Sequence, residues 1–175
     1  MRGCARHVLP ILLTLVPGTA PAQTCEIDFT IRVTQGVGFI RPDDVLRGEG
    51  HYTITGRSIR QEGGSTAWLA DGEMRLGEDI SGRIWTLMTT VGSPTADMMG
   101  VYAIDVTGLS FAGTDFEGPM AITLFGRTGT LDDPAPPLRQ EAWDSLDLRR
   151  AFSLQADGHD MLAGDVTAMT VQCDP

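Results

Sequence analysis

A histidine and a methionine two residues apart are the first candidates for chemistry in this sequence. The segment DGHDMLAGD, residues 157–165, holds His159 and Met161 with Asp157 and Asp160 beside them. In an oxidising compartment a His–Met pair could bind copper, and His with Asp could bind zinc. The same segment is typical of a hairpin turn, and no paired histidine or cysteine ligand accompanies it. We therefore expect no metal or other cofactor, with His159 and Met161 as the only candidate ligands.

The usual patterns of catalytic residues are absent from the sequence. Ser65 and Ser93 lie in glycine-containing turn segments and not in a G-x-S-x-G elbow. Adjacent acidic residues such as Asp43 and Asp44 are typical of solvated turns. The chain has no lysine, which excludes Schiff-base and P-loop lysine chemistry. We expect a protein without catalytic residues, and a hydrolase that uses His51 or His159 is the weakest alternative.

Aromatic and methionine side chains are the candidates for binding an apolar ligand. Trp85, Met88, Tyr102 and Met120 lie in or beside segments with an alternating apolar pattern. Trp85 and Tyr102 share the parity of neighbouring aliphatic residues, which predicts that both face the inside of the fold. In a wide barrel these four side chains would line an apolar cavity, whereas in a narrow barrel they would fill the core. Both alternatives stay open at this point.

Strands must position these residues, because the apolar positions along most of the chain repeat with a period of two. Ile27, Phe29, Ile31 and Val33 alternate with polar residues, which is the pattern of a strand with one buried face. Turn formers rich in Gly and Asp separate such runs, which favours an antiparallel all-β barrel or sandwich of about eight strands. The predicted strands span residues 25–34, 51–59, 66–69, 72–76, 82–91, 101–109, 120–125, 151–155 and 164–173.

Residues 134–150 are the main exception to the strand pattern. Pro134 begins the segment, and Leu138, Ala142 and Trp143 follow at roughly helical spacing. We predict one short helix near residues 138–150, packed across an end of the β-structure.

Two of the three cysteines, Cys25 and Cys173, lie at the start of the first predicted strand and the end of the last. Each shares the parity of the apolar positions in its strand, so both sulfur atoms are expected to face inward. In an even-stranded closed barrel the first and last strands are antiparallel neighbours, which brings these residues together. We predict a Cys25–Cys173 disulfide. A lipid anchor on Cys25 is the weaker alternative, because the preceding Ala-Gln-Thr does not resemble a bacterial lipobox.

The first 22 residues have the pattern of a secretory signal peptide. A short basic region precedes the apolar run 8–16, and Ala20-Pro21-Ala22 forms an A-x-A cleavage site. The apolar run has about half the length that a membrane-spanning helix needs. We therefore expect cleavage after Ala22, no stable membrane insertion, and a single β domain over residues 23–175 in the periplasm or outside the cell. The lack of Lys and Asn beside abundant Ala, Gly and Arg is typical of a GC-rich bacterial gene.

The chain that remains after this cleavage is acidic. Its 11 arginines oppose 23 aspartates and glutamates, a net charge of −12 with neutral histidines. That balance disfavours nucleic acid and anionic lipid as partners, because both are bound through basic side chains.

Together, these patterns predict a function in binding. We expect an exported, non-enzymatic β-barrel that binds a small apolar ligand or an envelope protein. One alternative is a structural or interaction module that acts through its acidic surface. A periplasmic metal-handling protein that uses His159 and Met161 is a weaker alternative.

Overall fold

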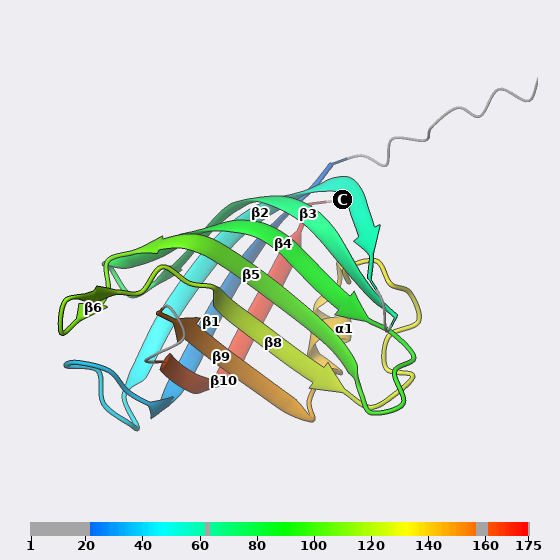
Figure 1. Cartoon of the computed structure of the whole chain (residues 1–175). Coiled ribbons are helices and arrows are strands. Elements are labelled where there is room, and N and C mark those ends of the chain that lie inside the picture. Colours follow the sequence, from blue (N-terminus) through cyan, green and yellow to red (C-terminus); the bar gives the residue numbers. More distant parts are fainter. Residues whose placement is uncertain (1–21, 62–63, 157–160, 175) are drawn as a thin grey trace, which may run out of the picture.

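The alternating segments close into an antiparallel β-barrel, one of the two architectures that the sequence predicted. The computed structural model describes residues 22–61, 64–156 and 161–174. The barrel strands pair in chain order, and the last strand returns to the first (Figure 1). The eight barrel strands are β1 (Gln23–Gln35), β2 (Val45–Arg60), β3 (Ser65–Leu76), β4 (Ile80–Thr90), β5 (Asp97–Thr107), β8 (Met120–Gly126), β9 (Arg149–Gln155) and β10 (Met161–Cys173).

Two small elements lie outside the barrel wall. Strands β6 (Ser110–Phe111) and β7 (Thr114–Asp115) form a separate hairpin between β5 and β8, which the sequence pattern did not predict. Helix α1 (Gln140–Asp144) lies between β8 and β9 and confirms one short helix, although it is shorter than the range 138–150. In the part of the chain that the structure describes, no helix has the length and apolar character needed to cross a membrane.

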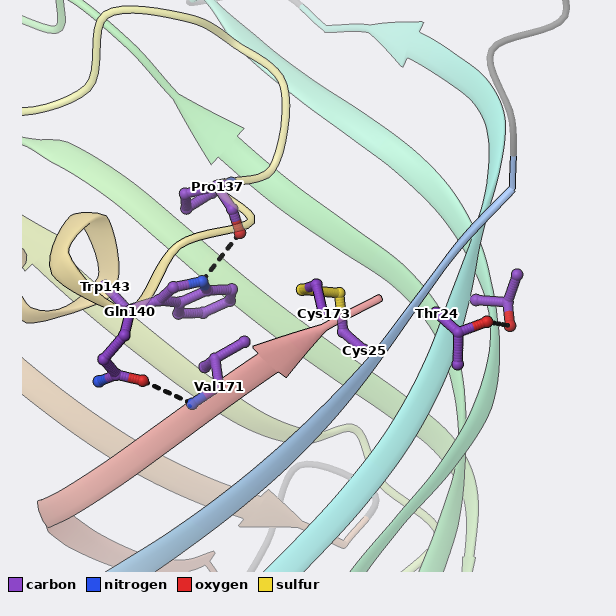
Figure 2. Close-up of a disulfide and its surroundings, with 8 residues drawn as sticks. Thr24, Cys25, Pro137, Gln140, Trp143, Val171 and Cys173 are labelled. Atoms are coloured by element: carbon purple, nitrogen blue, oxygen red, sulfur yellow. Dashed lines mark hydrogen bonds between the residues drawn. A yellow bond between two sulfur atoms is a disulfide. The ribbon is translucent and has the colours of Figure 1, made fainter. Parts of the chain in front are cut away.

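Strands β1 and β10 lie side by side, as predicted for the first and last strands. Their antiparallel register runs from the pair Cys25–Cys173 to the pair Gln35–Ala163. The two cysteines face each other with Cα atoms 4.0 Å apart and form a disulfide (Figure 2). The bridge joins residues 148 positions apart, so it fastens the seam that closes the barrel.

Strand β3 runs without a break through two segments that the sequence predicted separately. The predicted break between the strands 66–69 and 72–76 is wrong, because Asp71 and Gly72 lie inside β3 and pair with β2. A Cβ atom on Gly72 would overlap the carbonyl oxygen of His51, and the ladder with β4 shifts register between Leu69 and Gly72. The glycine therefore marks a β-bulge with a close backbone approach.

The inside of the barrel is a packed hydrophobic core. The Phe29 ring lies 6.2 Å from the Phe152 ring, and it extends over Gly48, where a Cβ atom would overlap it. Buried apolar residues come from every barrel strand, among them Ile31, Tyr52, Met74, Leu87, Val101, Ile122, Leu154 and Leu162.

Residues 127–148, including α1, lie at the end of the barrel next to the disulfide, which we call the helix end (Figure 1). Trp143 from α1 is only 1 % exposed and belongs to the barrel core. Its indole Nε1 donates a hydrogen bond to the Pro137 carbonyl oxygen at 2.9 Å (Figure 2). The opposite end, which we call the loop end, carries the connections 36–44, 77–79 and 108–119.

Candidate binding surfaces

The four side chains predicted to line a cavity do not come together inside the barrel. Met120 is fully buried in the core, as predicted for an inward residue. Trp85 instead lies on the outer face with 42 % of its surface exposed. Met88 and Tyr102 are partly exposed and alternate along their strands with the buried residues Leu87 and Val101.

Beta-bulges explain why the inward orientation predicted for Trp85 and Tyr102 was wrong. The β4–β5 ladder shifts register between Ile84 and Thr86, and the intervening Trp85 is left without a partner. The shift places both Ile84 and Leu87 on the inner face, each with 0 % exposure. A bulge at Asp105, with φ +55°, likewise separates the face of Tyr102 from that of the buried Val106.

The packed core leaves no room for a ligand beside its central side chains. A residue that borders a cavity wide enough for water keeps some accessible surface, whereas Met74, Leu87 and Met120 have none. The best-formed hollows among the described residues are open grooves that include outward-facing strand residues and connections at the barrel ends.

The Tyr52 hydroxyl is a polar group that lies buried in the interior of the barrel. Tyr52 is 1 % exposed and pairs with Cys25 across β1 and β2. Its oxygen has no hydrogen-bond partner, unlike every other buried side-chain polar atom in the described part of the chain. Burial raises the pKa of the Tyr52 hydroxyl well above its ordinary value, because the ionised form would lose its hydration.

A charged groove runs along the outer face of β1, β2 and β3. His51 pairs with Glu26 on β1 and with Glu73 on β3, and all three line a hollow of about 390 Å³. Asp28 directly faces Glu49 in the same groove. The lining residues carry no hydroxyl or thiol, so this groove gives His51 no nucleophile to activate.

The structure does not bring a metal site together within its described residues, where no three His, Cys, Asp or Glu side chains are placed to hold an ion. His159, one of the two candidate ligands, lies outside the described residues. Met161 is partly buried at the start of β10, paired with Gln155 of β9.

Two phenylalanines at the loop end are held in solvent and were not among the predicted site residues. Phe39, in the β1–β2 connection, is 82 % exposed, and Phe111, at the tip of the β6–β7 hairpin, is 45 % exposed. The signal in the sequence was a phenylalanine within a turn segment that contains glycine, GVGFI for Phe39 and FAG for Phe111.

Comparison with known proteins does not add to this description. No family model, no curated protein and no solved structure matches the chain. The chemistry of these surfaces is therefore the only guide to function.

Proposed function

We propose that this protein is an exported, non-enzymatic β-barrel module that binds a protein of the cell envelope through its outer surface. The main observation behind the proposal is that side chains fill the interior of the barrel, while aromatic side chains on its outside are exposed to solvent. Carriage of an apolar ligand requires interior space, yet the inward-facing Leu87, Met99 and Met120 are each 0 % exposed. Of the two predicted classes of partner, the envelope protein is therefore the better supported.

The Cys25–Cys173 disulfide supports the location in the periplasm or outside the cell. Such bridges persist in oxidising compartments and are rare where thiols are kept reduced. The predicted signal peptide agrees with this location; its residues 1–21 lie outside the described part of the chain.

A second candidate function is interaction through the charged groove on β1–β3, whose lining contains four carboxylates and one arginine. Asp28 and Glu49 are like charges directly opposite each other, an arrangement that destabilises a sheet, and on its other side Glu49 faces Arg75 of β3, the one arginine that lines the groove. A cationic group on a partner would relieve that repulsion. This observation supports the predicted alternative of an interaction module that uses its acidic surface.

Native mass spectrometry of the oxidised protein, with a fluorescent fatty acid as the apolar probe, tests the proposed function against ligand carriage. We expect the mass of the polypeptide alone and no saturable binding of the probe. Stoichiometric fatty acid bound to the native protein, with affinity reduced by the core substitution Val101→Phe, would contradict the proposal. The matched substitution Thr123→Val on the outer face is the control.

A further inference from the structure

The segments that carry the exposed phenylalanines of the loop end contact each other although they are far apart in sequence. A Cβ atom built on Gly38 would lie 3.5 Å from Cδ2 of Phe111, so the connection that carries Phe39 contacts the hairpin tip. Figure 1 shows β6 and the connection after β1 at the same end of the barrel, opposite α1. Phe39 and Phe111 therefore belong to two segments that contact each other at the loop end.

The connection that carries Phe39 is fixed to the barrel on both sides of the ring. Val37 and Ile40 are each only 6 % exposed and belong to the core. The Ile40 amide donates a hydrogen bond to the Val37 carbonyl oxygen at 3.0 Å, and the Asp43 amide donates one to the Val33 carbonyl oxygen at 2.8 Å. A hydrogen-bonded turn thus fixes the position of Phe39 and leaves its side chain exposed to solvent.

The hairpin that carries Phe111 is anchored in a similar way. Leu109 and Phe116 are 5 % and 0 % exposed, and the Phe116 amide donates a hydrogen bond to the Leu109 carbonyl oxygen at 3.0 Å. Ala112 and Gly113 both have positive φ, +51° and +81°, as a tight two-residue hairpin turn requires. The turn holds Phe111 at the tip.

The connections of the loop end are rich in acidic residues. The connections 36–44, 77–79 and 108–119 contain six carboxylates and a single basic residue, Arg41. The β3–β4 connection lies against the base of the hairpin, since a Cβ atom on Gly108 would overlap the Asp79 carbonyl oxygen. The carboxylates are Asp43, Asp44, Glu78, Asp79, Asp115 and Glu117.

We propose that Phe39 and Phe111 form a docking surface for a protein whose apolar pocket is bordered by arginine or lysine side chains. This inference rests on the proposed function and assigns its site. Rigidly presented aromatic side chains are efficient binding anchors, because little conformational freedom is lost on docking. The carboxylates of the loop-end connections complement a basic rim on the partner and repel anionic lipid.

Fluorescence anisotropy with two synthetic amphipathic peptides tests the chemistry of this surface. The probes are an 18-residue helix of leucine and arginine and a matched helix of leucine and glutamate. We expect the Leu/Arg peptide to bind the native protein, and the double substitution F39A/F111A to weaken that binding by at least about 30-fold. The substitutions D43N/D44N/D115N should also weaken binding and flatten its dependence on salt concentration.

The substitutions Ile59→Ala and Leu148→Ala together provide the matched control. Both side chains are exposed, 59 % and 51 %, and both lie outside the loop-end connections, so the control should change binding less than threefold. Equal loss of binding in the two double variants, or equal binding of the Leu/Glu peptide, would overturn the proposal. Binding to neutral phosphatidylcholine vesicles that depends on Phe39 and Phe111 would also overturn it, because the surface would then recognise a membrane.

Photo-cross-linking in the host envelope separates this inference from the proposed function. A photoreactive phenylalanine analogue is placed at position 39, 85 or 59 in turn. We expect one discrete protein adduct from position 39 that D43N/D44N/D115N abolishes, and none from position 59. An adduct from position 85 alone would refute the loop-end site and leave the proposed function standing, whereas no protein adduct from any position would refute both.

Discussion

At the scale of single residues, Tyr52 gives the barrel a measurable dependence on alkaline pH. Its hydroxyl is buried without a hydrogen-bond partner, and burial raises its pKa in the folded state. Above pH of about 10 the unfolded chain loses the tyrosine proton while the folded chain keeps it. The unfolded state then binds fewer protons than the folded state, so the free energy of unfolding must fall as the pH rises.

We predict that Tyr52→Phe removes this alkaline loss of stability. At pH 7 the variant should be as stable as the native protein, or more stable by up to about 1 kcal/mol, because no hydrogen bond is lost. Urea unfolding at pH 7, 9, 10 and 11 measures both effects. Tyr102→Phe is the control, since it leaves Tyr52 in place. A destabilised Tyr52→Phe variant at pH 7 would mean that the hydroxyl has a bound partner.

Asp97 shows what a buried carboxylate contributes when it is satisfied. It is 0 % exposed, and its two oxygens accept hydrogen bonds from the amides of Gly92, at 2.7 Å, and Leu131, at 2.9 Å. These bonds connect the β4–β5 turn to the covering segment 127–148. Removing a charged acceptor leaves a buried amide without its partner, which is costly.

Asp97→Asn should therefore lower the free energy of unfolding by about 2 kcal/mol. The matched substitution Asp105→Asn lies on the same strand, but its ion pair with Arg83 is exposed, and it should change stability by less than about 0.5 kcal/mol. Chemical denaturation of both variants measures the difference. Similar losses in the two variants would show that burial of Asp97 is not the cause.

At the scale of elements, α1 satisfies backbone groups of β10 at positions where β9 no longer pairs with that strand. In the described chain β10 pairs with β9 only over Met161–Asp165, and the second half of β10 continues past that ladder. Gln140 fills the gap, because its Oε1 accepts from the Val171 amide at 2.6 Å (Figure 2). Its Nε2 also donates to the Met169 carbonyl oxygen at 3.1 Å. The Gln140 side chain thus makes the two backbone hydrogen bonds that a neighbouring strand would otherwise make.

Gln140→Ala should cost about 1 to 2 kcal/mol, because both strand groups lose their partner. The Val171 amide should then exchange its hydrogen faster than the amides paired with β1, which hydrogen-exchange NMR resolves. Gln172→Ala, an exposed position on the same strand, should leave both quantities unchanged. Unaltered exchange at Val171 in the Gln140 variant would contradict this role for α1.

The strands show which part of the architecture is encoded locally. Period-two alternation predicted β1, β4, β5, β8 and β10 closely, because one face of each strand is buried and the other is solvated. The side on which Trp85 and Tyr102 lie was not predictable in this way. Each belongs to a strand with a register shift, and a shift of one residue exchanges the two faces. Local spacing contains no signal for such a shift.

The whole molecule determines the candidate surface, and for that reason the sequence did not predict it. Phe39 and Phe111 lie 72 positions apart, and the segments that carry them come into contact only in the folded barrel. The pairing of Cys25 with Cys173 was predictable over a longer separation, because both cysteines lie at strand ends whose parity and direction follow from an even-stranded barrel. No comparable rule predicts from the sequence which irregular connections will contact each other.

The disulfide allows a final prediction for the whole molecule, because it fastens a barrel that other interactions already close. Beyond Cys25–Cys173 the β1–β10 ladder continues to Gln35–Ala163, so removal of the bridge leaves the seam paired. The bridge closes a loop with a sequence separation of 148 residues, and the loss of that constraint should destabilise the protein by about 5 kcal/mol through the unfolded chain.

The double variant Cys25→Ser/Cys173→Ser should therefore keep the circular dichroism spectrum of the native protein while its urea midpoint falls. Dithiothreitol should lower the midpoint of the native protein to that of the variant and leave the variant unchanged. Loss of β-structure without denaturant would mean that the bridge, and not the strand ladder, holds the barrel closed. An unchanged midpoint would mean that the unfolded chain gains no freedom when the loop is opened.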